Sequence, residues 1–207
     1  IAGMGYPDIV YPVERLRERL GEKILQLKYR ADSEAICRRH GIPNRDIPDS
    51  ESLFELFGAS LDVYDVVQER GDEIIADLNH PYPDVSCGQY DFVLDVGTLE
   101  HCFNIAQALV NMAALVKVGG YVLHENPFNW GNHGFYSLNP TLFSDFYGDN
   151  GFEVVSCLLL PRGGGDPVSA PATKRFIFTG VEANVFTIAR KLEDKEYTFP
   201  VQTKYRR

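Results

Sequence analysis

Short apolar runs separated by polar turns dominate the chain after residue 58. They cover residues 61–64, 73–76, 91–94 and 121–124, and their β-branched and aromatic residues favour strands. A similar run over residues 1–4 stops at Gly5-Tyr6-Pro7-Asp8, where glycine and proline favour a turn. The pattern therefore predicts a strand in each of these runs.

Apolar positions between the last two of these strands repeat at helical spacing. A predicted N-cap, Asn104, precedes them, and Gly119 is the predicted stop. The residues on the apolar face are Ile105, Leu109, Met112, Ala113 and Val116. A strand, helix, strand unit makes a right-handed crossover, which implies parallel neighbouring strands with helices covering the faces.

The region from 12 to 58 is predicted to be mostly helical. Pro12 fits the first turn of a helix, and Ser33 is a predicted cap for a second helix that stops at Gly41. A third helix can be capped by Asp49 or Ser50 and end at Gly58.

The last third of the chain predicts one helix and three strands. The helix starts at Asn139-Pro140 and runs to Gly151, and the strands cover residues 152–160, 175–179 and 185–189. The fold class expected is a Rossmann-like α/β domain with a doubly wound sheet, mostly parallel, with an antiparallel C-terminal hairpin. We expect one domain over residues 1–207, with a helical insertion at about 12–58.

Composition narrows the classes of protein that fit. The chain has 207 residues, is 44% hydrophobic and carries a formal charge of −9, so we expect a folded protein and no nucleic-acid partner. The four cysteines form no C-x-x-C pair, which predicts reduced thiols in a cytoplasmic protein and no metal site. The apolar stretch at 105–123 is too interrupted to span a membrane. Because residue 1 already lies in a predicted strand, we expect sequence upstream of it.

Functional residues of a parallel α/β sheet gather where strands end. Gly3 and Gly5 follow the first strand and let a cofactor approach the backbone, although so short a glycine motif by itself more often marks a plain tight turn. Asp65 ends the second strand and can accept ribose hydroxyls or cap its own loop. Asp77 and Leu78 follow the third strand, where they can hold an adenine or form an Asx turn before Pro81.

The stretch from 90 to 123 carries a more specific signature. A hydrophobic strand ends in the turn Leu99-Glu100-His101, a helix follows, and Lys117-Val118-Gly119-Gly120 leads into the next strand. Asn150-Gly151-Phe152 adds a Gly-Phe turn before a later strand. With gaps, residues 50–160 thus resemble a class I S-adenosylmethionine-dependent methyltransferase of the type 11/12-like kind.

The resemblance implies S-adenosylmethionine as cofactor and S-adenosylhomocysteine as product. By position it implies the following cofactor-binding residues: Gly3, Gly5, Asp65, Asp77, Leu78, Gly97 and Thr98. The first motif departs from the family pattern, an acid followed by G-x-G-x-G, because this chain has Gly3-Met4-Gly5-Tyr6-Pro7-Asp8.

The methyl acceptor is expected at the loop 124–136, which is rich in aromatic, amide and imidazole groups. His133 is the predicted base, and Glu125 is a second candidate. Predicted substrate contacts are His101, Phe128, Trp130 and Tyr136. Each has a structural alternative: a histidine that holds the backbone or turn, a paired glutamate, and aromatic rings that simply pack.

The leading hypothesis is methyl transfer to an oxygen or nitrogen atom of a small molecule. The alternative is a methyltransferase-like binding or assembly protein without catalytic activity. A nicotinamide-dependent oxidoreductase comes last, because Pro7-Asp8 fits poorly with G-x-G-x-x-G opening a helix. Residues 12–58 could cover the cofactor as a lid. The oligomeric state stays open, a homodimer included.

Overall fold

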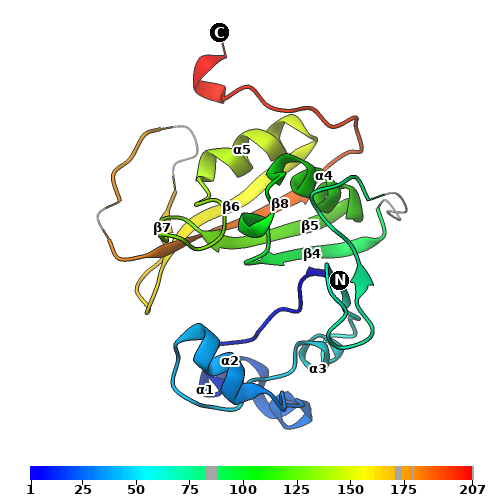
Figure 1. The fold of residues 1–207 in the computed structure, drawn as a ribbon, viewed down its shortest axis with the longest axis vertical. Coiled ribbons are helices and arrows are strands. Elements are labelled where there is room, and N and C mark those ends of the chain that lie inside the picture. The colour runs from blue at the N-terminus through cyan, green and yellow to red at the C-terminus, as the bar shows by residue number, and fades with distance from the viewer. Residues whose placement is uncertain (83–87, 171–173, 179, 207) are drawn as a thin grey trace.

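The computed structural model describes residues 1–82, 88–170, 174–178 and 180–206. Within these residues an eight-stranded sheet has the strand order β3-β2-β1-β4-β5-β8-β6-β7 (Figure 1). The strands are β1 (Ala2–Met4), β2 (Asp62–Asp65), β3 (Ile74–Ile75), β4 (Tyr90–Val96), β5 (Val116–Pro127), β6 (Phe152–Pro161), β7 (Val168–Ser169) and β8 (Ala183–Lys191).

Five of the eight strands, β3, β2, β1, β4 and β5, are parallel and doubly wound around β1. This strand pairs in parallel with β2 on one side and with β4 on the other, and β4 pairs in parallel with β5. At the far end β8 lies between β5 and β6 and is antiparallel to both. The expected Rossmann-like, mostly parallel sheet with antiparallel strands at the C-terminal end is therefore confirmed.

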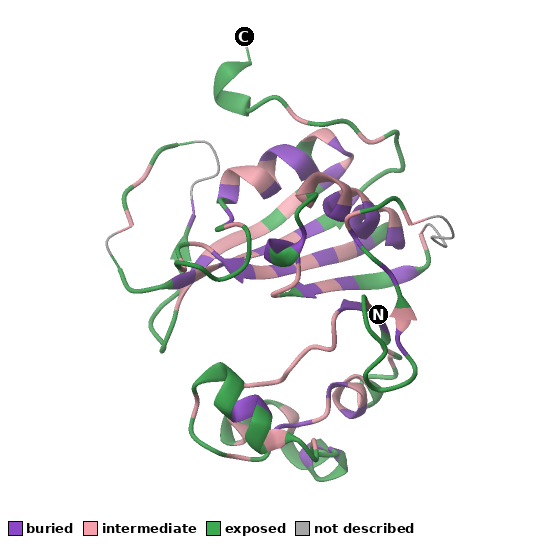
Figure 2. Cartoon of the chain, viewed as in Figure 1, coloured by how far each residue is buried: buried purple, intermediate pink, exposed green. Residues whose placement is uncertain are grey.

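Two helices, α4 (Ile105–Leu115) and α5 (Pro140–Asp149), pack on one face of the sheet (Figure 1). Buried and more exposed residues alternate along β5 and β8 (Figure 2), so one side of each strand faces the core. The core beneath the helices holds Leu109, Met112, Phe143 and Tyr147, all 1% exposed or less. Burial of these large side chains is the main stabilising term of the sheet.

Helix α4 ends earlier than its predicted glycine stop. Its last residue is Leu115, and β5 begins at once, so the expectation that Gly119 closes the helix is wrong. The buried Lys191 ammonium donates to the carbonyl oxygens of Ala113 (3.1 Å) and Val116 (3.0 Å). Because a cation satisfies these carbonyl groups, the helix end needs no left-handed glycine.

The other face of the central strands carries partly exposed rings. Phe92 of β4 and Tyr121 of β5 stack with their ring centroids 5.7 Å apart, and Phe92 is 43% exposed. The helices at the N-terminal end of the chain are gathered into a separate group below the sheet (Figure 1).

That group, the helical segment of residues 12–58, contains the predicted helices. They are α1 (Val13–Leu20), the 3₁₀-helix η1 (Gly21–Gln26), α2 (Ser33–His40) and α3 (Ser50–Glu55). Ile36, Cys37 and Ile47 form their own buried cluster there. Asp49 caps α3 as predicted by accepting from the Ser52 backbone amide.

Ser33 does not cap α2 as predicted. It is the first helical residue, and its hydroxyl donates to the Arg30 carbonyl while accepting from the Ile47 amide. The side chain therefore ties α2 to the segment before α3, and it is not free to bond the first turn of its own helix.

The predicted strand over 175–179 is also wrong for its described part. Residues 174–178 form no strand, and Thr179 lies outside the described residues. Phe176 stacks on Phe128 with ring centroids 5.9 Å apart, and Phe178 packs edge-on against the same ring at 5.8 Å. The alternating aromatic residues thus serve ring packing, while the short β7 pairs with β6 in place of the predicted strand.

No helix in the described part of the chain is long and apolar enough to cross a membrane. Cys37, Cys102 and Cys157 are free thiols, and Cys87 lies outside the described residues. A short 3₁₀-helix, η3 (Thr203–Tyr205), is held by Asp145, which accepts from the Thr203 amide at 3.1 Å.

Because the helical segment has its own apolar cluster, we expect it to lose structure separately from the sheet. Ile36→Ala should leave a cavity that costs about 2–5 kcal/mol of local stability. Hydrogen exchange followed by mass spectrometry should then show faster exchange in residues 12–58 and unchanged protection in β4 and β5. Equal loss of protection in both regions would contradict a separate cluster.

Candidate active site

The carboxyl ends of β1 and β4 lie where the strand order reverses, which is where α/β sheets bind ligands. Gly5 turns the chain there with a positive φ of 72°, and its amide donates to the Tyr64 carbonyl at 2.8 Å. The Thr98 hydroxyl donates to the Met4 carbonyl at 2.6 Å. A Cβ on Gly5 would lie 3.4 Å from that hydroxyl. The loops after β1 and β4 are therefore joined to one another at this edge of the sheet.

Asp95 is fully buried near the end of β4 and organises the turn that follows. Its Oδ1 accepts from the backbone amides of Thr98 and Leu99, both at 3.0 Å. These bonds fix the start of the 3₁₀-helix η2 (Leu99–His101). The turn carrying Gly97 and Thr98 is thus positioned by one carboxylate.

The second oxygen of Asp95 continues into a buried chain of hydrogen bonds. His124 Nδ1 lies 2.6 Å from Asp95 Oδ2, and His124 Nε2 lies 2.6 Å from the Tyr147 hydroxyl. Burial raises the pKa of Tyr147 well above its usual range, so the hydroxyl stays protonated and donates to Nε2. Nδ1 then donates to Asp95, which fixes the imidazole orientation.

Asn126 connects this chain to Glu100. Its Nδ2 donates to Asp95 Oδ2 at 3.0 Å and to Glu100 Oε2 at 3.1 Å. The other oxygen, Glu100 Oε1, is buried and has no hydrogen-bond partner. A buried carboxylate oxygen without a hydrogen-bond partner lowers the stability of the fold, so the groups that face it matter for its role.

Two imidazoles face Glu100 Oε1. His133 Nε2 lies 3.5 Å away and His101 Nε2 lies 3.8 Å away. The two rings are themselves edge to face, with centroids 5.3 Å apart. Both histidine side chains are about half exposed, whereas Glu100 is fully buried, so the cluster opens toward solvent on the imidazole side.

The protonation of this cluster is shifted toward neutral forms. Burial, and then the charge of Asp95, raises the pKa of Glu100 to about 7. Burial, and then the neighbouring His133, lowers the pKa of His101. Near neutral pH the cluster can therefore both accept and release a proton, which is the property of a general base.

The loop that carries His133 is fixed against η2. Phe135 donates from its amide to the Glu100 carbonyl at 2.8 Å. Gly134 has a positive φ of 72°, and a Cβ there would lie 2.8 Å from both the Cγ and the carbonyl oxygen of Glu100. The close approach of the loop to Glu100 therefore requires glycine at position 134.

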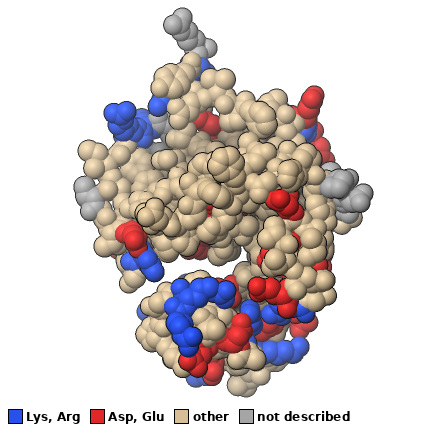
Figure 3. Space-filling view, viewed as in Figure 1, with Lys and Arg blue, Asp and Glu red and all other residues tan. Residues whose placement is uncertain are grey.

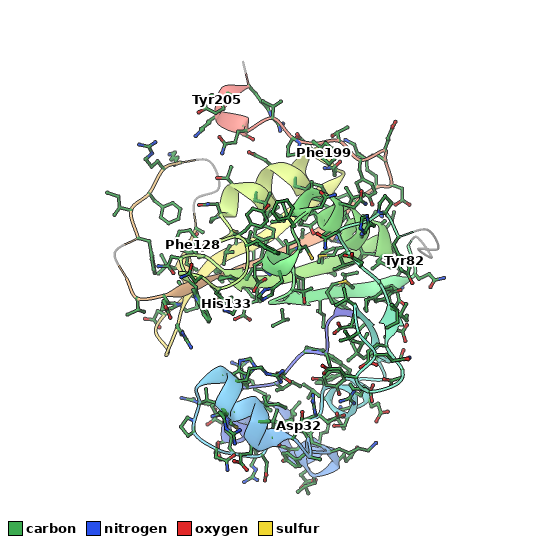
Figure 4. The ribbon with its side chains drawn as sticks, in the orientation of Figure 1. Asp32, Tyr82, Phe128, His133, Phe199 and Tyr205 are labelled. Atoms are coloured by element: carbon green, nitrogen blue, oxygen red, sulfur yellow. The ribbon has the colours of Figure 1, made fainter. Side chains whose placement is uncertain are left out.

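The predicted aromatic contacts lie around this loop. Trp130 packs on His133 with ring centroids 5.0 Å apart, and its indole donates to the Ala183 carbonyl at 3.1 Å. Tyr136 donates from its hydroxyl to the Phe103 carbonyl at 3.0 Å. Phe128 lines a separate cavity of about 370 Å³ that it shares with residues 174–176 and the start of α5. Figure 4 shows His133 at the margin of the sheet nearest the helical segment.

The predicted acidic residues after β2 and β3 occupy local turns. Asp65 Oδ1 accepts from the Val67 amide at 3.3 Å, and Asp77 Oδ1 accepts from the Asn79 amide at 2.9 Å. Leu78 is only 6% exposed and belongs to the main core. Asp65 keeps its second oxygen for a ligand, whereas Asp77 Oδ2 lies 3.7 Å from His80 Nε2, and Leu78 is mostly occupied by core packing.

Glu125 lies apart from the cluster. Side chains alternate along β5, so Glu125 faces the opposite side of the sheet from the buried His124 and Asn126. Its Oε1 accepts from the Asn184 side chain at 2.9 Å. The structure therefore brings together His101, His133, Gly97 and Thr98 of the predicted site, and it does not bring Glu125 to them.

Sequence reasoning missed the buried polar residues that support the site: Asp95, Glu100, His124 and Asn126. A signal for them was present. Asp95 follows Val93 at a spacing of two in a hydrophobic strand, and His124 and Asn126 follow Val122 in the same way. Polar residues on the core face of adjacent strands predict a shared hydrogen-bond network.

The loop after Gly5 is tied to the helical segment. Tyr6 donates to Asp49 at 2.6 Å, and the guanidinium groups of Arg30 and Arg70 lie 4.8 Å and 3.8 Å from its ring. Asp8 pairs with Arg39 at 3.0 Å. Figure 3 shows charged side chains gathered on this segment and the molecule hollowed between the segment and the sheet.

Comparisons with known proteins give a likeness to solved methyltransferases. No family model matches the chain, and no curated protein matches it. The 1,6-didemethyltoxoflavin-N1-methyltransferase of Burkholderia thailandensis, solved with 1,6-didemethyltoxoflavin and S-adenosylhomocysteine, is 14% identical at a TM-score of 0.49, over 70% of this chain and 67% of its own.

Two further solved structures are similar at the same level. TehB from Haemophilus influenzae is 14% identical at a TM-score of 0.47, over 69% of this chain and 53% of its own. A SAM-dependent methyltransferase from Archaeoglobus fulgidus is 12% identical at a TM-score of 0.46, over 88% of this chain and 96% of its own. The chain thus spans about half the length of TehB.

The hydrogen bonds around Asp95 predict a large effect of its removal. Asp95→Ala leaves two backbone amides, His124 and Asn126 without their buried acceptor and should lower the free energy of unfolding by about 3–5 kcal/mol. Asp91→Ala is the matched control, because Asp91 lies on the same strand but forms an exposed pair with Lys117, whose loss should leave the free energy of unfolding nearly unchanged. Urea unfolding measures both, and equal effects would contradict the role of Asp95.

Proposed function

We propose that the chain transfers a methyl group from S-adenosylmethionine to an oxygen or nitrogen atom of a small molecule. The observation that carries this proposal is the junction of the Gly5 and Thr98 loops at the strand-order reversal, beside the cluster of Glu100, His101 and His133. A position for the cofactor and a proton-accepting cluster thus adjoin in one place.

The residues at the carboxyl ends of β1, β2 and β4 fit an extended nucleoside cofactor. Gly5 and Gly97, with φ values of 72° and 82°, carry no side chain at the turns after β1 and β4. Gly3, expected after the strand, lies within β1, where a Cβ would meet the Gly5 carbonyl oxygen at 3.1 Å. The second carboxylate oxygen of Asp65 is available for ribose hydroxyls, whereas Asp77 would have to release His80, 3.7 Å from its Oδ2, to bind an adenine amine with that oxygen. The bound cofactor would supply a sulfonium methyl group that is already reactive.

The chain's own contribution to the reaction is orientation and proton removal. Trp130 packs on His133, and the Arg162 guanidinium lies 4.4 Å from the centroid of its ring, so an aromatic ring and a cation stand beside the cluster to contact a flat acceptor. The pair of Glu100 and His133, 3.5 Å apart, can take the proton that an attacking hydroxyl or amine loses. The free thiols of Cys37, Cys102 and Cys157 support a reducing compartment, and we propose the cytoplasm.

A second candidate is a methyltransferase-like protein that binds partners without catalysis. The observation that favours it is the engagement of Tyr6 and Asp8, directly after the glycine loop, by Asp49, Arg30 and Arg39 of the helical segment. In the non-catalytic protein the helical segment would occupy the position of the cofactor. In the enzyme it would act as a lid that closes over the cofactor.

Calorimetric titration with S-adenosylhomocysteine separates the two candidates. The enzyme hypothesis predicts micromolar binding that weakens roughly tenfold to a hundredfold in Asp65→Ala, since charge-assisted hydrogen bonds contribute about 1.5–3 kcal/mol each. Asp166→Ala is the control, because it removes the same charge from an exposed loop between β6 and β7, far from β2 in the strand order. A folded wild-type chain that binds nothing would favour the second candidate.

The proton-accepting role is tested with an acceptor found by screening. His133→Ala should lower the turnover number by about 10²- to 10⁴-fold and leave the affinity for S-adenosylhomocysteine unchanged. His80→Ala controls for loss of an exposed histidine, since His80 lies beside Asp77 and away from the cluster. An unaltered rate in His133→Ala would remove His133 from this role.

A further inference from the structure

The cluster of Glu100, His101 and His133 has the composition of a metal site. Among the residues that the structure describes, one oxygen and two imidazole nitrogens of these side chains lie within 4.8 Å of one another. The spacing of the cysteines predicted no metal site. The two histidines lie in different segments, His101 in η2 after β4 and His133 in the loop after β5. Folding alone brings them together.

We infer that Glu100, His101 and His133 bind a divalent first-row transition-metal ion. Imidazole nitrogen and carboxylate oxygen together suit zinc, iron(II), manganese and cobalt ions. Hard ions that require a set of oxygen ligands, such as calcium, fit two imidazoles poorly.

The distances support coordination of one ion. Ligand atoms about 2.0–2.2 Å from a tetrahedral zinc ion are about 3.3–3.6 Å apart. Glu100 Oε1 lies 3.5 Å from His133 Nε2 and 3.8 Å from His101 Nε2. Both imidazoles belong to partly exposed side chains, so small rotations can close the remaining gap.

An independent observation is the orphaned oxygen of Glu100. Oε1 is buried without a hydrogen-bond partner, although it faces the two imidazoles. A cation at that position would satisfy this oxygen and offset the cost of burying it. Gly97 borders this oxygen, since a Cβ there would lie 3.5 Å from Oε1 in ordinary van der Waals contact.

The surroundings orient the ligands as metal sites require. Asn126 holds the second oxygen of Glu100 at 3.1 Å, and Asn126 is itself held by Asp95. The Phe135 amide binds the Glu100 carbonyl and so fixes the loop that presents His133. Outer hydrogen bonds of this kind set ligand geometry and affinity.

Three protein ligands leave coordination positions open toward solvent, which is typical of catalytic and not of structural sites. With an ion bound, Glu100 Oε1 and His133 Nε2 are used as ligands and no longer accept a proton, so the ion itself would promote the reaction by lowering the pKa of an acceptor hydroxyl bound at an open position. This role rests on the proposed methyl transfer, whereas the binding of an ion does not. The two can therefore fail separately.

Titration of the untagged, metal-free chain with cobalt(II) tests the inference. Cobalt(II) reports nitrogen and oxygen ligands through its visible absorption, so no activity assay is needed. Wild-type protein should bind one equivalent, and His101→Ala and His133→Ala should each weaken binding at least about tenfold. His80→Ala, which removes an exposed histidine outside the cluster, should bind as wild type does.

Two outcomes would overturn the metal site: no cobalt(II) bound by the folded wild-type chain, or equal binding by the double variant His101→Ala/His133→Ala. The histidine variants keep the test valid even if Glu100→Gln disturbs the buried network. S-adenosylhomocysteine titration in the presence of EDTA is run in parallel. Binding of S-adenosylhomocysteine without binding of cobalt(II) would refute the metal site alone. Binding of cobalt(II) without binding of S-adenosylhomocysteine would refute the cofactor site alone.

Discussion

The buried carboxylate of Asp95 is the interaction on which the rest of the site depends. One oxygen holds the two amides that start η2, and the other meets His124 and Asn126 from the neighbouring strand. Through Asn126 the network reaches Glu100. A single fully desolvated group thus fixes the turn after β4, the end of β5 and the carboxylate of the cluster, because each buried partner is costly to leave unpaired.

Local patterns in the sequence predicted most of the sheet. Runs of apolar residues and helix periodicity predicted β1 to β6, β8 and helices α4 and α5, and missed only the two-residue β7 among the described strands. The strand predicted at 175–179 failed for a physical reason. Phe176 and Phe178 alternate like strand residues, but their rings pack on Phe128. Aromatic residues that pack in this way give the same alternation in the sequence as a strand, although no strand forms.

The site was only partly predictable, because its geometry depends on which loops meet. His133, His101 and Thr98 were found from their place after predicted strands. The sequence marks Glu100 only as the middle residue of a turn. Its proximity to the two imidazoles depends on Gly134, which lets the loop that carries His133 approach η2. Glu125 shows the converse, since its place in the sequence resembles that of His124 but strand alternation turns it to the other face.

Two features adjoin at one edge of the sheet. The turns after β1 and β4 carry glycines at positions 5 and 97, and the buried network holds a carboxylate and two imidazoles beside them. This arrangement suits a reaction in which the protein orients a reactive donor and takes up one proton. The buried side chains of Asp95, His124 and Asn126 lie at the carboxyl ends of β4 and β5, where they support this site.

A crystal structure of the chain grown with saturating S-adenosylhomocysteine tests the central claim most directly. The account predicts density between the carboxyl ends of β1 and β4, with the ribose hydroxyls within hydrogen-bonding distance of Asp65 and the sulfur atom beside Gly97 and Thr98. Density elsewhere on the molecule, or none between these strand ends at saturating ligand, would contradict it.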